Sequence, residues 1–261
     1  MKEKAILVVS FGTGYSEIRE LTIGAIERAI DKAFPEYEVF RAFTSKLVID
    51  KLKRRDGLVV DSVREAMEKL VQKGFCEVVV QSAHVMPGEE YEDMLSQVKP
   101  FEGRFHSIKY GEPLLGGEGD YVRLMDILKK SVQGYVDERT AAIFIGHGTA
   151  HRANLAYSKL GEMFRCTGDN RYLVGTVEAE PGVESCLKMV QGLSVKKVVL
   201  QPLMIVAGDH ANEDMAGDHK DSWKSLFTEQ GYQVECILRG LGECSRIQNM
   251  FVDHVRDALG K

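Results

Sequence analysis

The sequence has few cysteines and no long apolar run, and each of these facts excludes some classes of protein. It holds five cysteines in 261 residues, an odd number, and no two of them form a Cys-x-x-Cys pair. A disulfide framework or a structural zinc site is therefore not expected, and a reducing, cytoplasmic setting fits better. No stretch approaches the roughly 20 apolar residues that a membrane-spanning helix needs, so no membrane association is expected.

Basic residues are not in excess either. The formal net charge of -5 gives no reason to expect a nucleic-acid partner. The one short basic stretch, Lys51 to Arg55, is interpreted as the solvated face of a helix. The first apolar run, Ala5–Val9, has the length of a strand and is too short for the core of a signal peptide.

Several common catalytic motifs are missing. Neither the Gly-x-Ser-x-Gly nucleophile elbow nor the Walker A phosphate loop is present. The turn Phe11–Tyr15 contains two glycines but lacks the third glycine of a dinucleotide-binding loop. No tightly bound cofactor is therefore expected.

What the sequence does contain is a regular alternation of short apolar runs with longer amphipathic segments. This alternation is typical of parallel sheets covered by helices on both faces, and it indicates two halves of about four strands each. The expected strands are Ala5–Ser10, Glu38–Phe43, Glu77–Gln81, His106–Tyr110, Ala141–Ile145, Tyr172–Val177, Lys197–Leu203 and Gln233–Leu238. The expected helices include Ser16–Ala33, Ser62–Lys73, Asp120–Val132, Val183–Leu193 and Ser245–Leu259.

The two halves also resemble each other in sequence. Gly88-Glu89-Glu90 follows Gln81 at the spacing at which Gly208-Asp209-His210 follows Gln201, and one residue is inserted in the second copy before the next shared methionine. The motif Ser-Phe-Gly-Thr at 10–13 likewise matches Gly-His-Gly-Thr at 146–149. We interpret this as an internal duplication of one Rossmann-like α/β unit. The expected lobes are residues 1–135 and residues 136–261, the second carrying the histidines.

The duplication shows where the copies differ. His147 stands in place of Phe11, and His210 stands in place of Glu90. Both positions lie just past the carboxyl end of an expected strand, where open α/β sheets bind ligands. The second half has therefore gained two imidazoles where a ligand would sit.

A carboxylate at a third strand end would complete a metal site. Glu178 closes the strand that begins at Tyr172, and Glu180 is a rival two residues later. Two imidazoles and a carboxylate suit a divalent first-row ion. Asp209 or Asp214 would orient the His210 ring by accepting its other N–H, although Asp209 has an alternative role as a helix cap.

Taken together, these blocks resemble the class II tetrapyrrole chelatases, and most closely the anaerobic sirohydrochlorin cobalt chelatases of cobalamin synthesis. The resemblance covers essentially the whole chain. It rests on several blocks in the right order, which are much more specific than one motif. They are 8–13 (VVSFGT), 40–45 (FRAFTS), 88–92 (GEEYE), 146–148 (GHG), 177–178 (VE), 202–210 (PLMIVAGDH) and 221–224 (DSWK).

The resemblance implies a bilobal fold and a metal-inserting lyase. His147, His210 and Glu178 would bind the incoming Co²⁺, which is inserted into sirohydrochlorin with release of two protons. His147 would also serve as the base for a pyrrole N–H, since neutral imidazole is abundant near pH 7. Glu90, or its neighbour Glu89, would be a carboxylate that lines the cleft and stabilises positive charge or relays a proton.

The substrate would be a polycarboxylated macrocycle, and several residues of the first half are candidates to bind it. They are Phe11, Gly12, Thr13, Arg41, Ser45 and Glu90. Arginine binds carboxylates through two parallel hydrogen bonds, but Arg41 is equally well explained as a structural ion-pair partner. The alternatives to cobalt insertion are Fe²⁺ or Ni²⁺ insertion into a related tetrapyrrole and a non-catalytic carrier. A homo-oligomer is possible, because the apolar face of Ser245–Leu259 suits a core or an interface equally.

Overall fold

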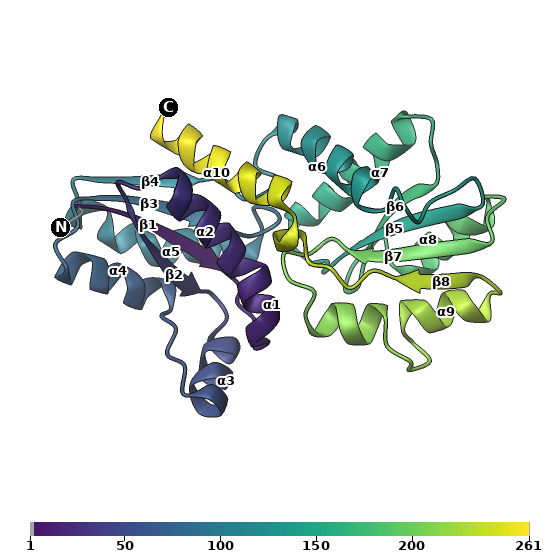
Figure 1. Cartoon of the computed structure of the whole chain (residues 1–261), viewed down its shortest axis with the longest axis horizontal. Coiled ribbons are helices and arrows are strands. Elements are labelled where there is room, and N and C mark those ends of the chain that lie inside the picture. The colour runs from purple at the N-terminus through teal and green to yellow at the C-terminus, as the bar shows by residue number, and fades with distance from the viewer. Residues whose placement is uncertain (1–2, 261) are drawn as a thin grey trace. The chain divides into compact units, whose positions relative to one another are not determined.

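Each half of the chain forms a four-stranded parallel sheet in the computed structural model, which describes residues 3–260 (Figure 1). The first sheet has the order β2-β1-β3-β4 and the second has the order β6-β5-β7-β8. The two orders are the same once the strands are numbered within each half, so the expected duplication and the α/β class are confirmed. The strands are β1 (Lys4–Ser10), β2 (Glu38–Phe43), β3 (Glu77–Ser82), β4 (Ser107–Gly111), β5 (Thr140–Gly146), β6 (Tyr172–Thr176), β7 (Lys197–Pro202) and β8 (Gln233–Cys236).

Helices cover both faces of each sheet, which explains why the central strands are apolar at successive positions. All seven residues of β5 are buried, as are six of the seven in β1. The helices are α1 (Ser16–Leu21), α2 (Ile23–Ala33), α3 (Lys46–Asp56), α4 (Val63–Gln72), α5 (Glu89–Val98), α6 (Glu118–Ser131), α7 (Leu155–Cys166), α8 (Val183–Gln191), α9 (Trp223–Glu229) and α10 (Ser245–Leu259). Short turns of 3₁₀-helix cover Lys99–Arg104, Arg152–Asn154 and Leu241–Glu243, and Ala211–Met215 is a π-helix.

The segment Ser16–Ala33, expected as one helix, is divided into α1 and α2 at Thr22. The hydroxyl of Thr22 donates a hydrogen bond to the carbonyl of Ile18, and the Thr22 backbone leaves the helical region at φ -113° and ψ -81°. A threonine that bonds back to the preceding turn competes with the helix ladder, which accounts for the break.

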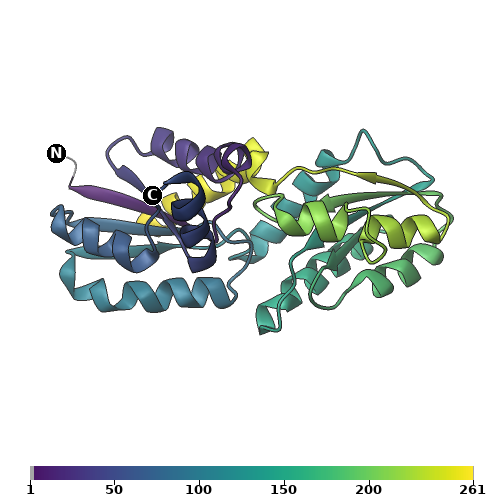
Figure 2. The same cartoon turned by 90° about the horizontal axis from the view of Figure 1, so that it is seen from below.

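The division into units differs from the expected boundary at residue 135. One unit runs to Gly117 and also takes in the chain from Gly242 onward, while the other covers Glu118–Leu241. The C-terminal α10 packs against α2, β3 and β4 of the first sheet, and both views show it beside that sheet (Figure 1, Figure 2). Its residues Ile247, Met250 and Phe251 are fully buried there, so the helix completes the core of the first unit.

Among residues 3–260, no helix combines the length and the apolar character needed to cross a membrane.

Candidate metal centre

Three side chains converge at the carboxyl edge of the second sheet. His147 directly follows β5, Glu178 follows β6, and His210 follows β7. Because β6, β5 and β7 are neighbours in the sheet and run parallel, their carboxyl ends lie side by side. One ligand atom from each of the three residues lies within 4.8 Å of the other two. The structure therefore brings the three predicted ligands together, and their role as ligands stays a prediction.

Backbone hydrogen bonds fix His147 and Glu178 relative to each other. The N–H of Glu178 donates to the carbonyl of His147 at 2.8 Å, and the N–H of Val177 donates to the carbonyl of Gly146 at 3.0 Å. These bonds extend the β5–β6 pairing past the ends of the strands. Gly148 has φ +87°, and a Cβ atom there would lie 2.8 Å from the backbone N of Ala179. Only glycine permits this close approach of the two turns.

Hydrogen bonds also define which ring nitrogen of each histidine is available. Nδ1 of His147 lies 2.8 Å from the carbonyl oxygen of Gly148, and Nδ1 of His210 lies 2.7 Å from Oδ2 of Asp214. A carbonyl and a carboxylate only accept, so each Nδ1 carries the proton that it donates. Each Nε2 then holds the lone pair, while Nδ1 is the nitrogen of His147 that lies beside Glu178, 3.6 Å from its Oε2. Asp214 is thus the carboxylate that orients His210.

The site is open to solvent. The side chains of His147, Glu178 and His210 are 49%, 52% and 35% exposed, and the two rings meet edge to face at 4.4 Å between centroids. In a tetrahedral site with bonds of about 2.0–2.2 Å the ligand atoms lie about 3.4 Å apart, so the three side chains would have to move closer together to share one ion. If all three residues bound one ion, positions would remain for a further partner, which is typical of catalytic rather than structural metal sites.

A single π-helical turn directly follows His210. The second copy contains one residue more than the first between the shared glycine and the shared methionine, and this extra residue lies in the π-helix Ala211–Met215, where the first copy has the regular α5. Met94 and Met215 are both fully buried in their own cores. The wider turn therefore accommodates the insertion without moving the methionine out of the core. π-Turns of this kind recur at functional sites.

Glu180, the rival of Glu178, is occupied elsewhere. Its Oε2 accepts hydrogen bonds from the hydroxyl of Ser185 at 2.6 Å and from the N–H of Gly182 at 3.0 Å. These bonds stabilise the carboxylate and lower the pKa of Glu180. The side chain thus caps the start of α8, and Glu178 is the carboxylate beside the two histidines.

Four of the predicted substrate-binding residues lie together in the first unit. Phe11 follows β1 and is 49% exposed, and the carbonyl of Phe11 accepts the N–H of Ser45 at 3.2 Å. Gly12 has φ +97°, and a Cβ there would lie 2.6 Å from the Phe43 ring. Thr13 is buried beside this turn. The hydroxyl of Ser45 accepts the N–H of Val48 and so caps α3, and the Ser45 carbonyl accepts the N–H of Ile49, so Ser45 joins this turn to the start of α3.

The two candidate glutamates of the first unit differ in burial. Both lie in the first turn of α5, after β3, but Glu90 is half-buried and Glu89 is exposed. The negative charge of both is favoured there by the helix dipole. Glu90 is therefore the better placed to act as a carboxylate with a defined orientation.

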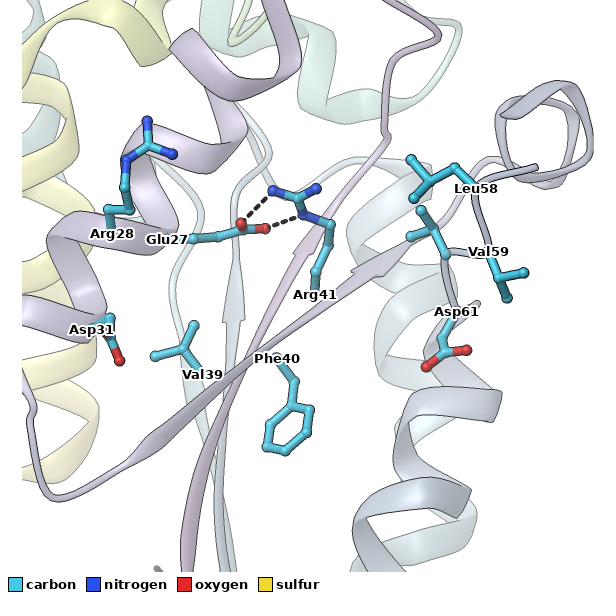
Figure 3. Close-up of a pocket in the computed structure, with 10 residues that line it drawn as sticks. Glu27, Arg28, Asp31, Val39, Phe40, Arg41, Leu58, Val59 and Asp61 are labelled. Carbon is cyan, nitrogen blue, oxygen red and sulfur yellow. Dashed lines mark hydrogen bonds and ion pairs between the residues drawn. The ribbon is translucent and has the colours of Figure 1, made fainter. Parts of the chain in front are cut away.

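Arg41 already has a carboxylate partner within its own unit. It lies inside β2, and its Nε and one terminal nitrogen donate to the two carboxylate oxygens of Glu27 at 2.7 and 2.6 Å. The pair lines a cavity of about 530 Å³ between α2, β2 and the segment 58–61 (Figure 3). This bidentate geometry corresponds to the structural role that the sequence left open for Arg41.

Comparison with known proteins places these features in a family. The family model described as cobalt chelatase (CbiK) matches residues 4–260. A sirohydrochlorin cobaltochelatase of Salmonella typhimurium is 40% identical over 98% of this chain and 97% of its own length. A second, sirohydrochlorin cobaltochelatase CbiKC of Nitratidesulfovibrio vulgaris, is 33% identical over 99% of this chain and 92% of its own.

Solved structures agree at the level of the fold. SirB from Bacillus subtilis with Fe³⁺ aligns with a TM-score of 0.64 at 14% identity, covering 99% of this chain and 96% of that protein. CbiX, described as the terminal enzyme for siroheme biosynthesis in denitrifying bacteria, aligns with a TM-score of 0.59 at 12% identity, covering 97% and 99%. With a family model matched almost from end to end and two long relatives above 30% identity, the chain belongs to the CbiK family of cobalt chelatases.

Proposed function

We propose that this protein is a sirohydrochlorin cobaltochelatase that inserts Co²⁺ into the macrocycle and releases two protons, as a step of cobalamin synthesis. The observation that carries the proposal is the open group of His147, Glu178 and His210 at the edge of the second sheet. Two relatives that cover almost the whole chain bear this name and support the same assignment. We place the reaction in the cytoplasm, where five free cysteines remain reduced.

In the proposed mechanism the triad holds Co²⁺ before transfer. One carboxylate and two neutral imidazoles reduce the charge of the bound ion from +2 to +1. Further coordination positions stay open, so pyrrole nitrogens can replace the protein ligands one at a time. Protonated imidazoles cannot bind a metal ion, so loading of the site weakens as the pH falls.

His147 then acts first as ligand and afterwards as base. Its Nε2 has a single lone pair, because Nδ1 donates its proton to Gly148. The lone pair cannot hold Co²⁺ and accept a proton at the same time. Only when the ion has moved onto the macrocycle does Nε2 become free to take a pyrrole proton. General-base assistance of this kind typically contributes about 10²–10⁴-fold to a rate.

The first unit would supply the remaining contacts to the substrate. Glu90 is proposed to stabilise positive charge or to relay the second proton to solvent. The backbone around Phe11–Thr13 is proposed to bind carboxylates of the macrocycle, and the exposed Phe11 ring to contact its flat apolar face. Ser45 is proposed to support this turn through its bond to the Phe11 carbonyl. Arg41 is the weakest member of this set, because Glu27 holds its guanidinium.

Turnover measurements test the proposal and its rivals together. Purified protein is incubated with sirohydrochlorin and with Co²⁺, Ni²⁺ or Fe²⁺ separately, without oxygen, and the absorbance of the product is followed. The donor set suits all three ions, so the rates decide among them. Catalytic insertion predicts many turnovers with Co²⁺ at the highest rate. Stoichiometric binding without turnover would instead identify a carrier, and a higher rate with Fe²⁺ or Ni²⁺ would change the metal.

A further inference from the structure

A buried arginine lies behind the turn that follows β1. Arg19 of α1 has only 6% of its surface exposed, and its Nη1 lies 3.5 Å from the carbonyl oxygen of Thr13 in this turn. Its Nε is buried without a hydrogen-bond partner and lies 3.9 Å from Oε1 of Glu20, which is beyond hydrogen-bond distance. Burial of a guanidinium is costly unless hydrogen bonds and an opposite charge compensate it, so an anion bound at this turn would stabilise Arg19.

The carboxylate of Glu20 is also shared with two further arginines. Its oxygens lie 3.2 Å from Arg28 and 3.5 Å from Arg41, and its side chain is 53% exposed. Glu27 holds Arg41 through two hydrogen bonds. The three guanidinium groups of Arg19, Arg28 and Arg41 thus share two carboxylates, and one positive charge of this group is left over.

The helix α3 brings further positive charge to the same turn. Lys51 and Arg55 are four residues apart and therefore lie on one face of the helix. The guanidinium of Arg55 donates a hydrogen bond to the carbonyl of Gly14, and Asp56 pairs with it through two hydrogen bonds of 2.7 Å. The stem of Lys51 crosses Gly14, where a Cβ atom would lie 3.4 Å from both Cδ and Cε of the lysine. The basic stretch 51–55 is therefore a contact surface at these two positions, and not only a solvated face.

The ammonium group of Lys51 differs from that of Arg55 in having no carboxylate beside it. Within residues 3–260, no carboxylate lies at ion-pair distance from its Nζ. The Nζ lies 5.9 Å from the centre of the Tyr15 ring, whose negative face attracts a cation, and the residue is exposed to solvent. Lys51 is thus an exposed, unneutralised cation held at the turn.

We propose that Lys51 binds a carboxylate of the macrocycle at the turn Phe11–Tyr15. This inference rests on the proposed function, which makes a polycarboxylated tetrapyrrole the substrate. Lys51 then provides the cationic contact that the sequence suggested for Arg41, whose guanidinium Glu27 already holds. The buried charge of Arg19 makes the same turn more favourable for an anion.

The test compares Lys51→Gln with Lys53→Gln. Lys53 is exposed on the same helix, and two residues turn an α-helix by about 200°, so its variant removes an equal charge from the opposite face. The dissociation constant for metal-free sirohydrochlorin is measured from the quenching of its fluorescence at low and high salt. A derivative whose carboxylates are converted to neutral amides serves as second ligand. Co²⁺ binding is measured by titration calorimetry, and circular dichroism checks the fold.

Lys51→Gln is expected to bind sirohydrochlorin about 10-fold more weakly than the wild type at low salt, and by a smaller factor at high salt. Its affinities for Co²⁺ and for the amide derivative should match the wild type. Lys51→Arg should retain most of the affinity, and Lys53→Gln all of it. Wild-type affinity of Lys51→Gln for sirohydrochlorin would overturn the proposal, and so would an equal loss of affinity for the amide derivative.

The proposed function and the role of Lys51 fail separately. If the wild type neither binds sirohydrochlorin nor inserts Co²⁺ into it, the proposed function is wrong, and the role of Lys51 falls with it. If the wild type binds and metallates sirohydrochlorin while Lys51→Gln binds it equally well, only the role of Lys51 is wrong.

Discussion

Replacement of Asp214 by asparagine tests the geometry of the metal centre without removing a ligand. Oδ2 of Asp214 accepts the proton of His210 Nδ1 at 2.7 Å, and the two side chains are 41% and 35% exposed. A hydrogen bond to a charged group contributes about 1.5–3 kcal/mol and a neutral one about 0.5–1.5 kcal/mol. Because the pair is partly exposed, we expect a loss near the lower end, about 1.4 kcal/mol, which is a 10-fold weaker binding of Co²⁺.

Asp93 provides the matched control, because it occupies the position of Asp214 in the first half, before the buried Met94. Its Oδ2 accepts a hydrogen bond from the side-chain amide of Gln97 at 2.6 Å, where Asp214 accepts one from His210. Titration calorimetry with Co²⁺ at pH 7 should show weaker binding for Asp214→Asn and wild-type binding for Asp93→Asn. Equal affinities of Asp214→Asn and the wild type would refute the claim that this carboxylate prepares His210 for the ion.

Two further predictions separate ligand from structural roles. Glu178→Gln should weaken Co²⁺ binding by 10-fold or more. Glu180→Gln should leave Co²⁺ affinity unchanged and lower the melting temperature at neutral pH. Because the pKa of Glu180 is lowered in the folded state, this stabilisation is lost as the pH falls through the folded-state pKa, and a difference in melting temperature that does not shrink as the pH falls would contradict it. Burial lowers the pKa of His84 to about 4, so below pH 6.5 the unfolded state binds a proton that the folded state does not bind. The free energy of unfolding should therefore fall between about pH 6.5 and 4. Urea titrations of His84→Met should show a shallower fall over this range, and a fall as steep as in the wild type would disprove the role of His84.

The repeat made much of the metal centre predictable. Strand ends in a parallel sheet meet at one edge, so residues that follow β5, β6 and β7 converge whatever their separation along the chain. The contrast between His147 and Phe11 then marked one of these ends as chemically special. The strands and their bounds followed from apolar runs, and most expected bounds lie within two residues of those observed, whereas the order of the strands in each sheet was not predicted.

Other features depend on contacts that sequence order does not encode. The amphipathic pattern of α10 shows that one face is buried, but it does not say against which sheet, and the helix joins the first unit. The sequence alone also could not decide whether Arg41 forms a structural ion pair or binds the substrate. Its partner Glu27 lies in a different element, α2, and the sequence does not show that the two side chains meet. The extra residue near His210 was visible in the repeat. That it is accommodated by a π-turn could not be predicted, because this depends on Met215 being buried at the same place in its core as Met94.

The packing of Tyr157 on Gly146, where a Cβ atom would lie 2.1 Å from Cε1 of the ring, could not be predicted for a similar reason. The apolar residues of α7 recur at helical spacing, and an aromatic residue in such a pattern is expected to be part of a core. Its ring meets Gly146 at the end of β5 only when the helix lies across the strand. The signal available in the sequence is Gly146, a glycine at a strand end where the sister half has Ser10.

A single-turnover transfer experiment tests the central claim most directly. The protein is loaded with about one equivalent of Co²⁺ and mixed with sirohydrochlorin in the presence of a chelator that captures any ion released to solvent. If the triad delivers its ion to the macrocycle, about one equivalent of cobalt product forms with the wild type and none with a variant that carries both His147→Ala and His210→Ala. Equal product from that double variant and the wild type would contradict the account.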